Sequence, residues 1–285
     1  MSNIIDAIIN IISNPVIKIT DYSKSHNRAN NMGEALEEYV KDVFANTVGE
    51  NDQAIRNRAL QSVFSYSGNQ NNPPDMMLRN GDAIEVKKIE NKNSQLALNS
   101  SYPKCKLYKN SSMISEGCRK ATDWGTESER EIVFVVGVCK ENVLSSLTMV
   151  YGIDYAASAE VYEKIARIIK DGISSIPDVE LAETNELGRV NKVDPLGITY
   201  LRVRGMWGIE NPTKVFNYIY SPVQDKQFNF MALINTEKYN SFVNHIELDN
   251  LVGLVAGLEI TDVEIRNPDN PVELKPAKMI TFNVG

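Results

Sequence analysis

Cysteine and histidine are scarce in this 285-residue chain, which contains three cysteines and two histidines. The three cysteines, Cys105, Cys118 and Cys139, are odd in number and have no metal-binding spacing with His26 or His245. This pattern argues against a disulfide framework, a zinc site and a histidine-based catalytic site. We therefore expect free thiols in a reducing cytoplasm.

Long apolar runs are also missing. No uninterrupted run approaches the roughly 20 apolar residues that span a bilayer. The apolar N-terminus has no basic start and carries Asp6, so we interpret it as a short amphipathic helix that Asn14-Pro15 ends, not as a signal peptide. A chain of this length and ordinary composition can bury a good core, and we expect one large domain.

Acidic residues outnumber basic residues in the chain as a whole, but one segment is basic. The formal net charge of −7 argues against a diffuse nucleic-acid binder. Residues 79–120, however, contain nine Lys and Arg against four acids, whereas residues 241–285 contain seven acids and three bases. This asymmetry suits a protein that meets DNA on one side only.

Residues 73–87 combine two carboxylates and a lysine at a spacing that suits phosphodiester hydrolysis. Asp75 comes first; Glu85, Val86 and Lys87 follow after nine residues. Side chains alternate along a strand, so Glu85 and Lys87 project from the same face. Two converging carboxylates can hold a hard divalent cation, and the ammonium can help to position a water. The spacing alone is a weak signal, because it often arises by chance in a charged chain.

The turn at Asn80-Gly81 decides which face of this hairpin Asp75 occupies. Asn-Gly between two strand-like runs is a strong hairpin signal. A two-residue turn would pair Asp75 with Val86, whereas a three-residue loop ending at a left-handed Gly81 pairs Asp75 with Glu85. Only an odd-length loop of this kind, or a bulge, brings Asp75, Glu85 and Lys87 to one face, so we predict the three-residue loop with a glycine bulge.

Residues 31–46 are predicted to form a helix ahead of the motif. An apolar stripe at helical spacing marks one side of it: Met32, Leu36, Tyr39, Val40 and Val43. On the helical wheel Glu38 lies opposite this stripe and is expected in water. Glu37 sits on the border of the stripe, where a carboxylate can point into a neighbouring cleft. A solvated helix flank is the alternative interpretation for Glu37.

The order of the remaining elements argues for an α/β fold with a mixed sheet and the site at a strand end. Residues 131–139 form a continuous apolar run of strand length, typical of a strand buried on both faces. Further strands are predicted at residues 61–66, 76–78, 83–89, 147–151, 198–203, 215–220 and 228–234, and helices at 112–124 and 159–171. Residues 17–30 and 67–74 are expected to be irregular, and residues 177–197 an exposed loop.

Pro74-Asp75 followed by Glu85-Val86-Lys87 looks like the PD-(D/E)XK nuclease motif. MGEALEEYVKDVF and FSYSGNQNNPPD before the motif, and EVKKIENKNSQLALNSSYPKCKL after it, resemble the NgoPII-type family of type II restriction endonucleases. VVGV and MVYGIDY fit the same family. The resemblance implies a restriction-endonuclease-like core with a central mixed sheet, flanking helices and additional C-terminal α/β elements. It is clearest over residues 4–155.

The resemblance also implies a mechanism. It assigns Mg²⁺, with Mn²⁺ as a substitute, to Asp75, Glu85 and the Val86 carbonyl, and contact with the attacking water to Lys87. Glu37 is the expected outer ligand, since this nuclease family commonly carries a glutamate on the helix before the motif. The implied products carry 5′-phosphate ends, and the implied target is GGCC. We expect a single endonuclease domain over residues 1–285, with a catalytic core at about 28–155 and a recognition or dimerisation region at about 156–285.

Candidate DNA contacts lie in two places. Polar or cationic side chains after the catalytic strand can read base edges or grip phosphates: Asn99, Ser100, Ser101, Lys104, Lys106, Arg119 and Lys120. Farther along, Arg202 and Arg204 alternate to one face of a predicted strand, as paired readers of guanine would. A polar loop and an exposed edge are the respective alternative interpretations.

Several functions remain open at this point. The leading prediction is a type II restriction endonuclease acting on double-stranded DNA as a homodimer, because a twofold protein offers two equivalent sites to a palindrome. A cognate DNA methyltransferase is expected genetically, not as a physical partner. The alternatives are a mismatch nickase or junction resolvase, a DNA-binding protein of the same fold without cleavage activity, and a structural protein without a DNA partner.

Overall fold

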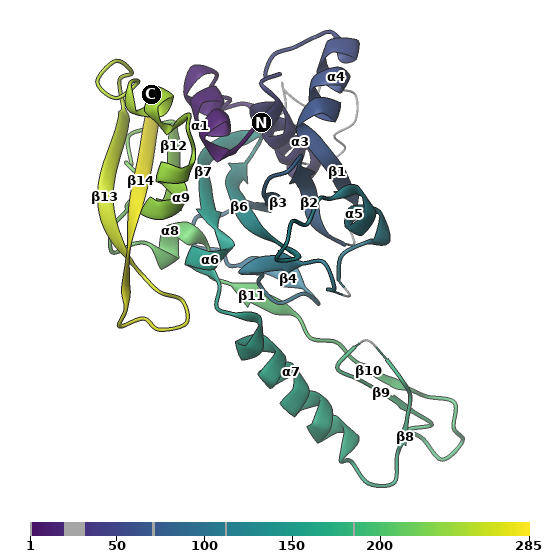
Figure 1. Ribbon diagram of the computed structural model, residues 1–285. Coiled ribbons are helices and arrows are strands. Elements are labelled where there is room, and N and C mark those ends of the chain that lie inside the picture. The colour runs from purple at the N-terminus through teal and green to yellow at the C-terminus, as the bar shows by residue number, and fades with distance from the viewer. Residues whose placement is uncertain (1, 20–31, 70–71, 112, 185) are drawn as a thin grey trace.

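The computed structural model describes residues 2–19, 32–69, 72–111, 113–184 and 186–285, and a large mixed sheet forms the centre of this part of the chain (Figure 1). The strand order is β1-β2-β3-β6-β7-β12-β14-β13, and β5 pairs with β6. The strands are β1 (Phe64–Asn69), β2 (Asn72–Leu78), β3 (Ala83–Ile89), β5 (Lys106–Tyr108), β6 (Glu129–Lys140), β7 (Val143–Tyr151), β12 (Phe228–Asn235), β13 (Leu258–Arg266) and β14 (Leu274–Val284). β3 runs parallel to β6 and β7 parallel to β12, and the other pairs are antiparallel. The predicted mixed sheet is confirmed.

Helices flank this sheet, and small strand pairs lie beside it. The helices are α1 (Ile4–Ser13), α3 (Met32–Ala45), α4 (Gln53–Val63), α5 (Glu116–Ala121), α6 (Gly152–Tyr155), α7 (Ala159–Ser174), α8 (Pro212–Val215), α9 (Thr236–Ser241) and α10 (His245–Asp249). β4 (Leu96–Asn99) pairs with β11 (Trp207–Ile209), and β8 (Glu180–Leu181), β9 (Gly188–Asn191) and β10 (Leu201–Val203) form a three-stranded sheet. No described helix is both long and apolar enough to cross a membrane.

β6 is buried on both faces, as its apolar run predicts. Val133 and Val135 face a core cluster shared with α1 and α3, whereas Ile132, Phe134 and Val136 face a second cluster on the other side. The stripe on α3 packs into the first cluster, and a Cβ at Gly137 of β6 would lie only 2.6 Å from Leu36. This close approach seats α3 directly over the sheet and places its border residues beside β3.

Four expectations about local structure are wrong. Residues 61–63 continue α4, so β1 begins only at Phe64, and residues 67–69 and 72–74 belong to β1 and β2 instead of an irregular approach. Residues 177–197 contain β8 and β9. Residues 215–220 are turned and not extended, because Phe216 and Tyr220 are four apart and both point into the core. The i, i+4 spacing of this apolar pair is typical of a helical turn and not of a strand.

The remaining local predictions hold in full or in part, or fall outside the described residues. α1 ends at Asn14 as expected, and α7 matches the predicted helix at 159–171. α5 covers only residues 116–121 of the predicted helix at 112–124, and β10 covers only residues 201–203 of the predicted strand at 198–203. Most of the expected connecting loop at 17–30, including His26, lies outside the described residues.

An arm made of α7 and β8–β10 projects from the body below β4 and β11 (Figure 1). The arm has a thin core: among its described residues only Gly188 and Val190 are buried, and α7 buries no residue. Ile173 of α7 packs against β9, where a Cβ at Gly188 would lie 2.7 Å from it. Val161, Ile165, Ile168 and Ile169 form an exposed apolar face of α7 beside Ile173, and each is between 41% and 57% exposed.

Candidate active site

The β2–β3 hairpin brings Asp75 and Glu85 opposite each other. Met76 pairs with Ile84 and Met77 with Ala83, so the same register sets Asp75 across from Glu85. The Leu78 amide donates to the Asp82 carbonyl at 3.0 Å, which closes a loop of three residues. The three-residue loop and its consequence for Asp75 are confirmed.

The left-handed residue of this loop is Asn80, with φ +54°, and not the predicted Gly81. Asparagine tolerates this region because its short polar side chain bonds locally. Gly81 is required for a different reason: a Cβ there would lie 2.9 Å from the Cβ of Leu78. The predicted loop length is therefore right, but the positive φ belongs to Asn80 and not to Gly81.

Asp75, Glu85 and Lys87 form one compact cluster at the middle of the hairpin. The Val86 amide donates to Asp75 Oδ2 at 2.7 Å, and Lys87 Nζ lies 2.5 Å from Glu85 Oε1. The Glu85 and Lys87 side chains are only 13% and 24% exposed. The strand alternation thus brings both onto the face that Asp75 shares.

The electrostatics of the cluster favour a bound cation. Burial, and then the charge of Glu85, raise the pKa of Asp75 to about 7, although Lys87 and the Val86 amide oppose the rise. Burial would lower the pKa of Lys87, but Glu85 and Asp75 outweigh burial and raise it. The ionised carboxylates of Asp75 and Glu85 therefore repel each other in a buried site, and the charge of Lys87 does not fully offset this repulsion.

Glu85 Oε2 supports the same conclusion. This oxygen is buried and has no hydrogen-bond partner among the described residues, and an acidic oxygen in that state suits a metal ligand. The described residues contain no group of three or more His, Cys, Asp or Glu side chains arranged to hold a metal. A donor set of two carboxylates and one backbone carbonyl fits Mg²⁺ nevertheless, because Mg²⁺ usually keeps several of its waters.

The charge of Glu37 on α3 acts on the cluster. Its charge raises the pKa values of both Asp75 and Lys87, and its carboxylate pairs with Lys41 at 2.9 Å. The border position on the wheel is therefore next to the site.

The expectation that Glu38 lies in water is wrong. Its side chain is 19% exposed and accepts from Arg56 Nη2 at 2.6 Å, and it also pairs with Lys41. Arg56 in turn binds the fully buried Asp42. The reason is tertiary: α4 folds back onto α3 and delivers Arg56 to the side of the helix that the wheel assigned to solvent.

Gly68 is a positioning residue that the sequence reasoning missed. A Cβ there would lie 2.4 Å from the Pro74 carbonyl and 3.1 Å from the Asp75 carbonyl. The absence of a side chain lets β1 approach β2 at the residue that carries the first carboxylate. A glycine inside a strand-like run is the signal for such a close approach.

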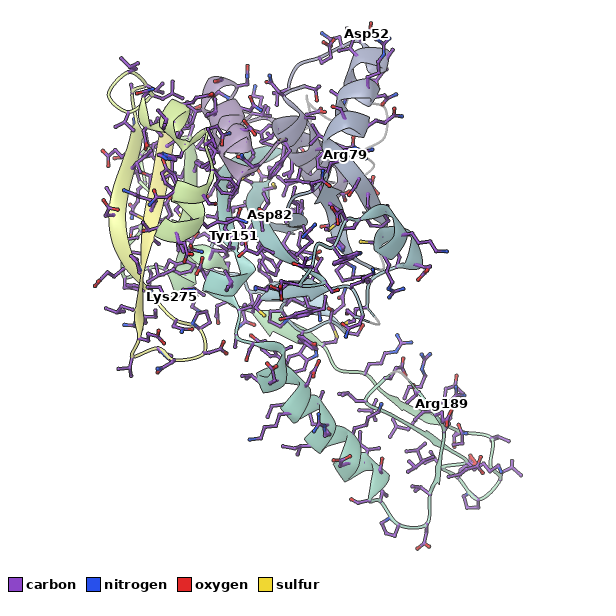
Figure 2. The ribbon with its side chains drawn as sticks, viewed as in Figure 1. Asp52, Arg79, Asp82, Tyr151, Arg189 and Lys275 are labelled. Carbon is purple, nitrogen blue, oxygen red and sulfur yellow. The ribbon has the colours of Figure 1, made fainter. Side chains whose placement is uncertain are left out.

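A second polar cluster anchors the turn end of the hairpin. Tyr151 donates to Asp82 Oδ2 at 2.8 Å, and Lys238 Nζ lies 3.1 Å from Asp82 Oδ1 and pairs also with Glu131. Figure 2 shows Asp82 and Tyr151 side by side in the body of the protein. Sequence carried no signal for this contact, because Lys238 is 156 residues away from Asp82.

The residues after β3 that are predicted to contact DNA differ in their exposure and in the hydrogen bonds that they already make. Asn99 and Ser100 are exposed at the end of β4, and Lys120 is 77% exposed. Arg119 donates to the Lys109 and Ser111 carbonyls and pairs with Glu116, so it holds its own loop together. Three of these residues, Ser101, Lys104 and Lys106, lie partly or fully buried around β5.

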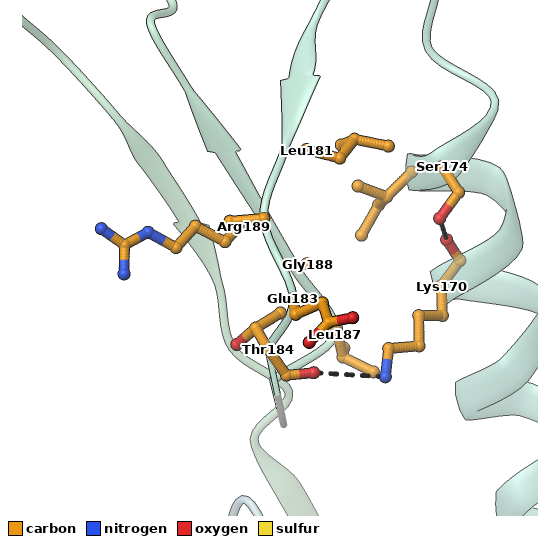
Figure 3. A pocket seen from close by; sticks show the side chains of 10 residues that line it. Lys170, Ser174, Leu181, Glu183, Thr184, Leu187, Gly188 and Arg189 are labelled. Atoms are coloured by element: carbon orange, nitrogen blue, oxygen red, sulfur yellow. Dashed lines mark hydrogen bonds between the residues drawn. The ribbon is translucent and has the colours of Figure 1, made fainter.

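Arg202 and Arg204 lie on the arm and share one face, as the alternation predicts. Both bind Glu186, at 2.5 Å and 2.6 Å, and both stay about half exposed. A groove of about 640 Å³ lies on the arm between α7 and β9, and Lys170 donates to the Thr184 carbonyl across it (Figure 3). This groove contains none of the predicted catalytic residues.

Comparison with known proteins places this site in a family. The profile of the NgoPII restriction endonuclease family matches residues 2–266. The type II restriction enzyme NgoPII of Neisseria gonorrhoeae is 56% identical over 285 residues, which cover 99% of this chain and 100% of that enzyme. No solved structure matches the chain. The chain belongs to the NgoPII restriction endonuclease family, a family of type II restriction enzymes.

Proposed function

We propose that this chain is a Mg²⁺-dependent, site-specific endonuclease of the PD-(D/E)XK class that hydrolyses double-stranded DNA at a short palindrome. The observation that carries the proposal is the grouping of Asp75, Glu85 and Lys87 on one hairpin face, with a buried Glu85 oxygen that has no hydrogen-bond partner. Membership of the restriction endonuclease family supports double-stranded DNA as the substrate of these residues.

Asp75, Glu85 and the Val86 carbonyl would hold the metal. A bound Mg²⁺ neutralises charge that builds up on the phosphate oxygens and favours ionisation of a water at neutral pH. Lys87 has a raised pKa, so it acts as a hydrogen-bond donor that orients the water and the phosphate, not as a base. Glu37 supplies a further carboxylate at the edge of the cluster, where a second metal or a water can use it.

The finer details rest on the family resemblance. In-line attack of water on phosphorus breaks the bond to the 3′ oxygen and leaves 5′-phosphate and 3′-hydroxyl ends. We propose GGCC as the target and Mn²⁺ as a substitute metal. The free thiols of all three cysteines suit a reducing cytoplasm, where a cognate methyltransferase would protect the host DNA.

Residues 1–285 are proposed to act as one domain. The catalytic hairpin and the C-terminal strands β12, β14 and β13 lie in a single sheet, which supports this view. The exposed residues Asn99, Ser100, Lys120, Arg202 and Arg204 are proposed to meet DNA phosphates or base edges, together with Ser101, Lys104, Lys106 and Arg119.

A second copy of the chain is the proposed partner of the exposed face of α7. A twofold axis across the helix between Ala166 and Arg167 would set Ile165 against Ile168 of the second copy. The same axis sets Val161 against Gly172, which has open space around it, and brings Lys164 beside Asp171. Apolar contacts and opposite charges thus match in an isologous pair.

Digestion of a plasmid of known sequence tests the proposal. The wild-type protein is expected to give discrete fragments that map to one palindrome in Mg²⁺ and none in EDTA. Lys87→Ala is expected to lose at least 10²-fold in rate. Lys88→Ala is the matched control, because the neighbouring lysine pairs with the exposed Glu90 and should leave the rate within about twofold.

Other outcomes would contradict specific parts of the proposal. DNA that is bound but uncut under every divalent metal would indicate a binding protein of the same fold. Random degradation would retain the hydrolytic chemistry and exclude the restriction function.

A further inference from the structure

Lys104 is a buried cation in the segment between β4 and β5. The residue is 8% exposed, and its Nζ lies 3.3 Å from the centre of the Tyr102 ring and 3.1 Å from the sulfur of Met113. Within the described part of the chain it forms no ion pair with a carboxylate. A lysine is rarely buried unless it is paired, because a ring face and a thioether replace only part of its hydration.

Lys104 lines a pocket with several hydrogen-bond donors. The pocket has a volume of about 380 Å³, and Lys106, Tyr108 and Ser111 line it with Lys104. Glu163 in the same lining accepts from the Tyr102 hydroxyl, and Lys106 pairs with Glu129. The Lys104 ammonium and the hydroxyls of Tyr108 and Ser111 can bind an anion there. The Tyr102 ring beneath Lys104 is held in place by a stack on Tyr162 and by its hydroxyl, which donates to Glu163. The floor of the pocket is therefore rigid.

The pocket lies within electrostatic reach of the catalytic cluster. Lys106 at the edge of the pocket pairs with Glu131 of β6, and Glu85 pairs with Phe134, three residues farther along the same strand. The charge of Glu85 is also among those that act on Lys104. When a DNA phosphate lies at the metal that Asp75 and Glu85 would hold, the next phosphate along the strand lies close by. A backbone that reaches Asp75 and Glu85 is therefore also available to the pocket.

We propose that Lys104 binds a DNA phosphate adjacent to the scissile one, and that its ionisation makes substrate binding sensitive to pH. This inference rests on the proposed function and extends it to a named residue and a regulatory property. Because the contact is to the backbone, it adds affinity and position without sequence information.

The surroundings of Lys104 make it the group that titrates. Burial lowers the pKa of Lys104 to about 8, and Glu163, Cys105 and Glu85 only partly oppose this. Burial raises the pKa values of Cys105, Tyr102, Tyr108 and Tyr162, while the hydrogen bond to Glu129 raises that of Lys106. Between pH 7.5 and 9.5, Lys104 is thus the member of this neighbourhood that loses its charge.

DNA binding by the full-length protein, measured from pH 7.5 to 9.5 with Ca²⁺ in place of Mg²⁺ to prevent cleavage, tests the inference. Wild-type affinity is expected to fall about tenfold across this range. Lys104→Arg should keep its affinity throughout, because arginine stays charged. Lys104→Met keeps the aliphatic stem, so it should bind about tenfold more weakly at pH 7.5, with a flat pH profile and a salt dependence lower by about one phosphate contact.

Lys226→Met is the control, since that lysine donates to the Gly285 carbonyl and lies outside the pocket. It should retain the wild-type pH profile. If Lys104→Met binds like wild type with an unchanged pH profile while the wild type cleaves plasmid, the inference is wrong and the proposed function stands. If the wild type neither binds nor cleaves DNA, both are wrong.

Discussion

Asp75 is held in surroundings that favour its neutral form, although the proposed chemistry needs its carboxylate. Its pKa of about 7 lies above the ordinary value near 4 of an unfolded aspartate. The ionised group therefore costs folding stability, and this cost grows as the pH rises from about 4 to about 7. A bound divalent cation would remove the cost, so binding and stability are linked at this residue.

Asp75→Asn should therefore stabilise the protein while it abolishes cleavage. At pH 8 we expect a gain on the order of 1–3 kcal/mol, because the amide still accepts from the Val86 amide without a buried charge. The gain should shrink as the pH falls and vanish near pH 3, where the wild-type carboxyl is mostly protonated in both states. Thermal unfolding at both pH values, with and without Mg²⁺, measures this.

Two further readouts make that prediction specific. Mg²⁺ should raise the melting temperature of the wild type and leave that of Asp75→Asn unchanged. Asp262→Asn is the control, since its carboxylate is 78% exposed and should affect neither quantity. If Asp75→Asn and the wild type have the same melting temperature at every pH, the ionised Asp75 carboxylate does not destabilise the folded protein.

Lys104→Met should also stabilise the protein at neutral pH. The pKa of Lys104 is about 8 in the folded state and about 10.4 in an unfolded chain, so the wild type pays for a buried charge below pH 8. We expect a gain of about 1–3 kcal/mol at pH 7, reduced by loss of the contact with the Tyr102 ring. Thermal unfolding at pH 7 and pH 10 checks this: the difference should shrink at the higher pH. Equal or lower stability of the variant at pH 7 would contradict it.

At the scale of elements, close contact between β1 and β2 positions the first carboxylate. Gly68→Ala would force its new Cβ against the Pro74 carbonyl, and backbone cannot move aside as a flexible side chain does. We expect about 10²-fold loss of cleavage from displacement of Asp75, at a stability cost of about 1–3 kcal/mol. Cleavage rates and chemical denaturation measure the two effects separately.

Gly117→Ala is the matched control for that substitution. Its Cβ would sit 3.6 Å from the Tyr66 ring in ordinary contact, inside a helix where alanine is preferred. It should therefore cleave like wild type. Full activity in Gly68→Ala would show that the β1–β2 spacing does not control Asp75.

Some features of the helices and strands follow from the local sequence pattern, and others do not. The helical stripe of α3, the double burial of β6 and the odd loop of the hairpin follow from periodicity and turn chemistry. The position of Glu38 does not, because α4 contributes Arg56 to a side of α3 that looks polar in isolation. Phe216 and Tyr220 show the converse error, since a short apolar segment fits a strand or a turn of helix equally well.

At the scale of the whole molecule, the exposed face of α7 predicts the oligomeric state. Light scattering should find a dimer for the wild type, and Ile165→Glu should weaken dimerisation by about 100-fold or more, because it places a charge in an apolar contact. Loss of the dimer should shift plasmid cleavage from linear product toward nicked circles. Val272→Glu is the control, because Val272 is 91% exposed outside the arm. A monomeric wild type, or a dimer that Ile165→Glu leaves intact, would contradict the proposed interface.

The sequence by itself determined which side chains share one face of the β2–β3 hairpin. Alternation along a strand, the loop length around Asn80-Gly81 and the order of Asp75, Glu85 and Lys87 are local properties, and local sterics suffice to set them. Only the tertiary structure decided which other groups meet this hairpin. Lys238 and Tyr151 reach its Asp82 from distant strands and helices, and those contacts depend on the shape of the folded core, which no local pattern encodes.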